Sequence, residues 1–164
     1  MEEFYVRKSR DVAIGLKHIE KALKAKVTQI GHKVIVEGDA LAEYDAKQVF
    51  EALNFGFTVR KALLLVQEDF VFKKIHIKEH TKRSLHDVVA RLIGKHGKSK
   101  RVLSDISGCE ILINDGEVGI IGESENLLET ETAIIHLIRG SKHSNMYRFL
   151  EKKLKRKKDD QVLV

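Results

Sequence analysis

Residues 94–97 of the chain, Gly-Lys-His-Gly, are the part of the sequence best suited to hold a charged ligand. Two glycines three positions apart let a backbone turn approach a bulky group closely, because glycine has no side chain to intervene. A helix predicted to begin just after Gly97 would direct its free N–H groups and the positive end of its dipole at the same place. Four cations surround the turn, namely Lys95, Lys98, Lys100 and Arg101. Together these features predict a site for phosphate groups of a nucleic-acid backbone.

The sequence around this loop predicts a regular succession of strands and helices. Apolar residues recur at helical spacing before and after the loop, and they alternate with polar ones further on, as in a half-buried strand. The expected elements are a strand at 70–77, an apolar helix ending at 93, a helix at 98–107, strands at 109–113 and 118–121 joined by a turn at 114–116, and a helix at 125–139. The predicted order is therefore β-α-α-β-β-α, a mixed α/β (α+β) fold.

A G-x-x-G loop between two helices in this order resembles the loop of a type I KH domain, a module that binds single-stranded RNA. The resemblance implies three-stranded antiparallel sheets packed on helices, and a loop that clamps about four nucleotides. It also implies an apolar base-binding groove beside the loop, with Lys100 reaching over it, while His96 could hydrogen-bond a phosphate. The candidate RNA-binding residues are Ala90, Ile93, Gly94, Lys95, His96, Gly97, Lys98, Lys100, Arg101, Ile111 and Ile113.

Two other interpretations of the loop are weaker. Gly97-Lys98-Ser99 resembles the end of a nucleotide-binding P-loop, but that motif needs glycine five residues before the second glycine, where this chain has Leu92. A P-loop also follows a buried strand, whereas the residues before this loop have a helical pattern. A plain surface turn explains the lysines but not two glycines between two apolar helices.

The predicted domain occurs twice. When the sequence is shifted by 84 residues, its two halves align without a gap from about residue 16 to residue 58, and Gly56 falls on Gly140. The counterpart of the loop, residues 10–13, reads Arg-Asp-Val-Ala, which has no glycine and carries an acid. The apolar helix that should precede it is also missing. We therefore predict that the first copy is a degenerate domain that does not bind RNA through its own loop.

Length and charge bound the organisation of the chain. Its 164 residues suit one or two small domains, and we expect a degenerate domain with a connecting helix at 1–69, a complete domain at 70–151 and a basic tail at 152–164. The connecting segment has helical spacing, so we expect the two domains to pack as one unit. A net charge of +6 and a pI of about 9.3 fit an anionic partner. Six of the seven residues from 152 to 158 are cationic and could add non-specific phosphate contacts.

The sequence predicts no catalytic centre, no cofactor and no metal site. Cys109 is the only cysteine, which excludes an internal disulfide and a set of zinc thiolates. His86, His136 and His143 fall on predicted helices without a carboxylate or cysteine at ligand spacing. No signal peptide or membrane span is recognisable, which predicts a cytoplasmic protein.

Three stretches, residues 52–63, 92–101 and 140–151, extend the resemblance to nearly the whole chain. They resemble the partner-of-Nob (Dim/Pno) KH proteins and the related Krr proteins of small-ribosomal-subunit assembly, in a short form that looks archaeal. The resemblance implies a non-enzymatic rRNA-processing factor that binds near the 3′ end of small-subunit rRNA. It implies, as partners, the Nob endonuclease and the alpha subunit of archaeal initiation factor two. Two alternatives stay open: a protein-interaction adaptor with structural KH domains, and a general KH translation or transcription factor.

Overall fold

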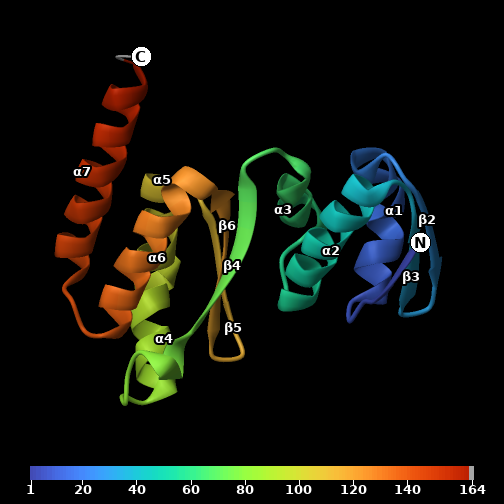
Figure 1. The fold of residues 1–164 in the computed structure, drawn as a ribbon. Helices are drawn as coiled ribbons and strands as arrows, with labels where there is room; N and C mark the ends of the chain where they lie inside the picture. The colour runs from blue at the N-terminus through green and yellow to red at the C-terminus, as the bar shows by residue number, and fades with distance from the viewer. Residues whose placement is uncertain (163–164) are drawn as a thin grey trace. The chain divides into compact units, whose positions relative to one another are not determined.

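The computed structural model describes residues 1–162 and divides into two compact units, Met1–Phe72 and Lys73–Val164. Each unit contains a three-stranded antiparallel sheet packed on helices (Figure 1). The predicted mixed α/β fold is therefore confirmed. None of the described helices combines the length and the apolar character that crossing a membrane requires.

The first unit has a sheet with strand order β1-β3-β2. Its elements are β1 (Glu2–Tyr5), α1 (Ser9–Leu23), β2 (Lys26–Ile30), β3 (Lys33–Glu37), α2 (Ala40–Phe55), α3 (Val59–Ala62) and the 3-10 turn η1 (Leu63–Val66). Helix α2 begins where the Asp39 carboxylate accepts a hydrogen bond from the Ala42 N–H at 2.8 Å, and it ends at Gly56, whose φ is 131°. Because α3 and η1 follow directly, the segment after Gly56 is helical, as predicted.

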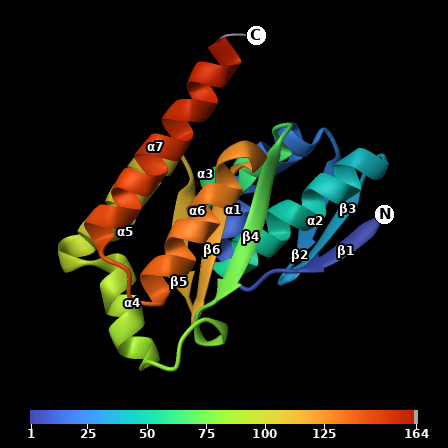
Figure 2. The same ribbon diagram turned by 60° about the vertical axis from the view of Figure 1, so that its left-hand side comes forward.

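The second unit has a sheet with strand order β4-β6-β5 and carries the G-x-x-G loop between α4 and α5 (Figure 2). Its elements are β4 (Phe70–His76), η2 (Ile77–Glu79), α4 (Leu85–Ile93), η3 (Lys95–Gly97), α5 (Lys98–Ser107), β5 (Glu110–Asn114), β6 (Glu117–Glu123), α6 (Ser124–Ile138) and α7 (His143–Val162). The strand that begins at residue 70, the helix at 98–107 and the hairpin are confirmed. The two-residue turn of the hairpin has positive φ at both positions, 49° at Asp115 and 74° at Gly116, which matches the twist of the strands.

The internal repeat is confirmed by the positions of the elements. Strands β2 and β5 lie 84 residues apart at both ends, and so do the starts of α2 and α6. Helices α3 and α7 also begin 84 residues apart, at Val59 and His143, so the repeat extends beyond the aligned region. Helix α1 runs without interruption from Ser9 and therefore includes the counterpart of the G-x-x-G loop.

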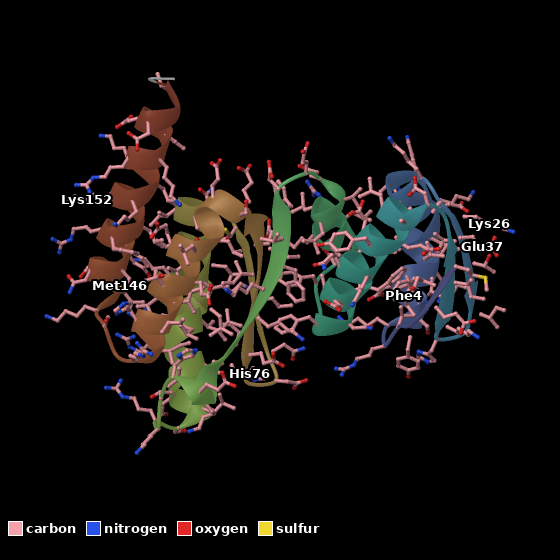
Figure 3. The ribbon with its side chains drawn as sticks, viewed as in Figure 1. Phe4, Lys26, Glu37, His76, Met146 and Lys152 are labelled. Carbon is pink, nitrogen blue, oxygen red and sulfur yellow. The ribbon has the colours of Figure 1, made fainter. Side chains whose placement is uncertain are left out.

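The basic segment from residue 152 is part of helix α7 and not a tail. Leu154 is buried, one turn after the fully buried Leu150, so an apolar stripe of α7 continues into this segment. Lys157 forms an ion pair with Glu129 of α6 at 3.6 Å. Figure 3 shows Lys152 on the outer side of α7, directed away from α6. Residues 163 and 164 of the expected tail lie outside the described residues.

Candidate nucleic-acid interface

The loop at residues 94–97 is a tight turn between α4 and α5. Gly94 has φ 75° and ψ 175°, His96 has φ 54°, and Gly97 has φ 73°. The Gly97 N–H donates to the Gly94 carbonyl at 3.2 Å and closes the turn. Three left-handed residues within four positions explain why the chain leaves one helix and immediately enters another in a new direction.

Gly94 is required because Ser99 lies directly against it. A Cβ atom at position 94 would stand 2.7 Å from Ser99 Cβ and 2.8 Å from the Ser99 backbone nitrogen. At Gly97 a Cβ would meet no atom within 4 Å, so only its positive φ favours glycine there. The first glycine therefore packs the loop onto α5, and the second leaves the outer surface of the loop open to a ligand.

No side chain caps the first turn of α5, although the Lys98 N–H donates to the Lys95 carbonyl. The N-cap residue of α5 is Gly97, which has no side chain to accept from the backbone N–H groups there. Ser99 is 4% exposed, and its hydroxyl has no hydrogen-bond partner in the described structure. Donors without acceptors at a helix N-terminus favour the binding of an anion such as a phosphate.

The predicted cations remain together around this turn. Lys95, His96, Lys98 and Arg101 are exposed, and Lys100 is half-buried. No ion pair joins any of them to a carboxylate in the part of the chain that the structure describes. The Arg101 guanidinium makes a long, 3.5 Å hydrogen bond to the His96 carbonyl, which leaves its charge available. The loop therefore carries a positive potential that no ion pair neutralises within residues 1–162.

The side chains of the expected groove residues differ in how far they are exposed. Ala90 is exposed and Ile93 is 36% exposed, so both side chains are open to a ligand beside the loop. Ile113 is half-buried at the edge of the core. Ile111 is only 5% exposed and belongs to the core itself, so it supports strand β5 and cannot form an open groove wall. The apolar side of the candidate site therefore comprises Ala90, Ile93 and Ile113.

The excess of positive over negative charge lies entirely in the unit that holds this loop. The first unit has eleven Lys and Arg residues and eleven Asp and Glu residues, whereas the second has nineteen and thirteen. The whole net charge of +6 thus belongs to residues 73–164.

In the first unit, residues 10–13 form the opening turns of α1, where the Val12 N–H already donates to the Lys8 carbonyl at 3.2 Å. That segment is closed, regular helix and has no exposed loop.

Two residues that the sequence did not indicate as part of the site, Arg91 and His143, fix the position of the last turn of α4, just before the loop. The Arg91 guanidinium donates to the carbonyls of Leu137 and Ser141, at the end of α6. His143 Nε2 lies 2.9 Å from the Arg91 carbonyl and so joins the start of α7 to the last turn of α4. Burial lowers the pKa of Arg91, and the charge of Arg83 lowers it further. The only sequence signal for these contacts was the unusual stretch at 140–151, whose role the pattern did not disclose.

Nothing in the described residues is arranged as a metal or thiol centre. No group of three or more His, Cys, Asp or Glu side chains is placed to hold a metal ion there. Cys109 is buried, and its burial raises the pKa of the thiol. A thiol with a raised pKa is a poor nucleophile.

Comparisons with known proteins agree with this geometry. Residues 70–155 match the model of the second KH domain of PNO1, described as a eukaryotic type KH domain (KH-domain type I). The chain is 31% identical over 149 residues to the KH domain-containing protein MJ0443 of Methanocaldococcus jannaschii, covering 90% of this chain and 64% of that protein. It is 29% identical to the RNA-binding protein PNO1 of Oryzias latipes, covering 66% and 46%. The chain thus spans between about half and two thirds of the length of these curated relatives.

Two solved structures from Pyrococcus horikoshii OT3 have the same fold. Dim2p superposes with a TM-score of 0.78 at 28% identity, covering 92% of this chain and 98% of that one. A chain from the a/eIF2alpha-aDim2p-rRNA complex superposes with a TM-score of 0.77 at 28% identity, covering 96% and 94%. The similarity to these structures therefore extends over both units, each of which has a counterpart in Dim2p.

Proposed function

Because this chain belongs to the Pno1 family of KH proteins, we propose that it is a single-stranded RNA-binding factor of small-ribosomal-subunit assembly. It takes part in rRNA processing and binds near the 3′ end of the small-subunit rRNA. The observation that carries the proposal is the turn at 94–97, with its open outer surface, uncapped helix start and unneutralised cations. This arrangement suits the phosphates of a single strand, and the exposed Ile93 beside it suits a base.

The names of related proteins indicate the partners that we propose for this chain. The PNO1 protein of Oryzias latipes is called an RNA-binding protein, and that of Aspergillus oryzae a pre-rRNA-processing protein. The Pyrococcus complex joins a/eIF2alpha, aDim2p and rRNA. We accordingly assign rRNA and the alpha subunit of archaeal initiation factor two to this chain as partners. The Nob endonuclease stays a prediction of the family resemblance.

The same reasoning supports a binding role in the cytoplasm. We propose a cytoplasmic location, as the resemblance to the Dim2p structures of Pyrococcus horikoshii OT3 implies. Burial raises the pKa of the Cys109 thiol, which makes it a poor nucleophile. We therefore propose that the protein holds RNA for other factors and is not itself an enzyme.

A protein-interaction role has a specific observation in its favour for the first unit. That unit carries no net charge, and its loop counterpart is regular helix. Both features disfavour an RNA phosphate chain, and both are compatible with a protein partner. We propose that the second unit binds RNA and that the first unit serves protein contacts.

Crosslinking of the protein to RNA in its own cells, followed by sequencing of the bound sites, tests this proposal. We expect a peak near the 3′ end of small-subunit rRNA that disappears when Lys95 and His96 are replaced by Asp. Scattered messenger RNA sites would instead indicate a general translation or transcription factor. If RNA is not crosslinked but the initiation-factor subunit still copurifies, the adaptor function is correct and RNA binding is wrong.

A further inference from the structure

The turn between α6 and α7, residues 139–143, is a second concentration of positive charge in the second unit. We call it the α6–α7 joint. Gly140 adopts φ 110° there, and α7 begins at His143. The Arg91 guanidinium and the His143 ring hold this joint against α4, through the Ser141 carbonyl and the Arg91 carbonyl respectively. The joint therefore lies close to the end of α4, where the G-x-x-G loop starts (Figure 2).

The first copy of the domain shows what this joint needs for structure alone. The matching turn reads Gly56-Phe57-Thr58-Val59, 84 residues earlier, and Gly56 also has positive φ, 131°. Thr58 caps α3 by accepting from the Lys61 N–H at 3.4 Å. A joint of the same length thus ends one helix and starts the next without a single cation. The charges of the second joint are an addition in the copy that also has the G-x-x-G loop.

These added charges form no ion pair with any residue that the structure describes. Lys142 and Arg83 are exposed, and neither forms an ion pair in the described residues. The Arg83 guanidinium lies over Gly140, since a Cβ atom there would be only 2.9 Å from Arg83 Nη2. After burial, the charge of Arg83 is the second cause that lowers the pKa of Arg91. No Asp or Glu occurs anywhere from residue 132 to residue 150.

We propose that the α6–α7 joint, with Arg83, is a second phosphate-binding site, which holds the RNA chain beyond the G-x-x-G loop. Arg83 and Lys142 bind phosphates, whereas Arg91 and His143 position the joint. The inference rests on the proposed RNA-binding function. RNA is the ligand that the geometry favours, because the site continues from the loop: Arg91, which holds the joint, lies only three residues before Gly94. Ile93 and Arg91 project from opposite sides of α4, so the RNA chain passes over the end of the helix at the loop.

RNAs of two lengths distinguish binding at the α6–α7 joint from binding in the groove beside the G-x-x-G loop. A four-nucleotide RNA fills one KH groove, whereas a ten-nucleotide RNA also reaches the joint. We compare the wild-type protein with the double variant Arg83→Gln and Lys142→Thr, the second change being the residue that the first copy has at this position. Both side chains are exposed and form no ion pair among the described residues, so the variant should melt like the wild type. The control, Lys17→Gln with Arg60→Gln, removes the same charge from exposed positions of the first unit.

We expect the double variant to bind the four-nucleotide RNA within twofold of wild type and the ten-nucleotide RNA about tenfold more weakly. The slope of log affinity against log salt for the longer RNA should become shallower by about 1.4, which is about 0.7 for each of two lost phosphate contacts on a single strand. The control should leave both affinities unchanged.

An equal loss on both lengths, or an unchanged affinity and slope for the ten-nucleotide RNA, would overturn the joint as a phosphate site. The proposed function fails separately. If the wild type does not bind the four-nucleotide RNA, the groove is not a binding site, although the longer RNA still tests the joint. If neither RNA binds the wild type, both proposals are wrong.

Discussion

Replacing Lys95 and His96 together by Asp is the most direct test of the loop. Both side chains are exposed, and neither takes part in an ion pair among the described residues. Both glycines stay in place, so the turn that they form is kept. Aspartate also tolerates the left-handed conformation of position 96, where φ is 54°, better than most residues do. The variant therefore changes the charge that faces the ligand while leaving the fold intact.

The size of the effect follows from simple electrostatics. One pair of unit charges 4 Å apart in water is worth about 1 kcal/mol. Replacing Lys95 by Asp turns one attraction into a repulsion, about 2 kcal/mol, and replacing a neutral His96 adds one repulsion, about 1 kcal/mol. The sum of about 3 kcal/mol predicts an affinity about a hundredfold lower, since each 1.4 kcal/mol is tenfold. Exposed substitutions change stability by about 0.5 kcal/mol or less each, so the two together should move the melting temperature by about 4 °C at most.

The chain offers a matched control. Lys17 and His18 are the same residue pair, adjacent and exposed on α1 of the first unit. Replacing them by Glu, which suits a helix, changes the total charge as much as the loop variant does. The measurement is the binding of a labelled single-stranded oligonucleotide at fixed salt, because the protein has no tryptophan to report it. A loss specific to the loop variant supports contact with phosphates at residues 94–97.

Two results would refute this reasoning. Unchanged affinity of a folded loop variant would show that the G-x-x-G loop takes no part in binding. An equal loss in the Lys17 and His18 control would show that affinity depends on total charge and not on the loop. In either case the open outer surface at Gly97 would need another explanation.

Three further outcomes are expected. Ile93→Ala should weaken binding of a preferred RNA sequence more than that of a random one, because our proposal places a base against this exposed side chain; equal losses would mean that it only supports the fold. Lys152→Gln with Lys155→Gln should make the salt dependence shallower by up to about 0.7 per lost contact without changing sequence preference; an identical slope would show that this face of α7 is free of RNA. Arg10→Gly with Ala13→Gly should lower stability by about 1 kcal/mol per glycine in α1 and leave one site per chain for a short RNA; a second site would disprove the degeneracy of the first copy.

The elements were predictable because their signals are local. Helix α5 was bounded by Gly97 and Gly108, and both adopt positive φ where the helix starts and stops. The hairpin was indicated by its Asp115-Gly116 turn, and the alternation of apolar residues fixed the strands on either side. The internal repeat supported the prediction independently, because both halves of the sequence show the same order of elements. Agreement between periodicity, turn residues and repeat made the order of elements secure.

What the sequence could not give depends on contacts between distant residues. The packing of Ser99 against Gly94, which makes glycine necessary, needs the turn to be folded before the two atoms meet. The bonds from Arg91 to the end of α6 join residues 46 and 50 positions apart. Ile111 and Ile113 share one face of β5, and only the covering helices decide that the first is core and the second half-buried. The charge of the basic run after residue 151 predicted a tail. Leu154 within that run is buried, and this contact keeps α7 helical there.

The two copies together separate what the fold needs from what binding needs. Strands, the α2 and α6 helices and the glycines at 56 and 140 recur at a constant spacing, so they belong to the scaffold. The G-x-x-G turn, the cationic joint and the excess of Lys and Arg occur only in the second copy, although the first copy folds without them. Features absent from a folded copy of the same domain cannot be requirements of folding. Their joint presence in one unit is therefore best explained by a shared ligand, and a polyanion is the one ligand that all three would attract.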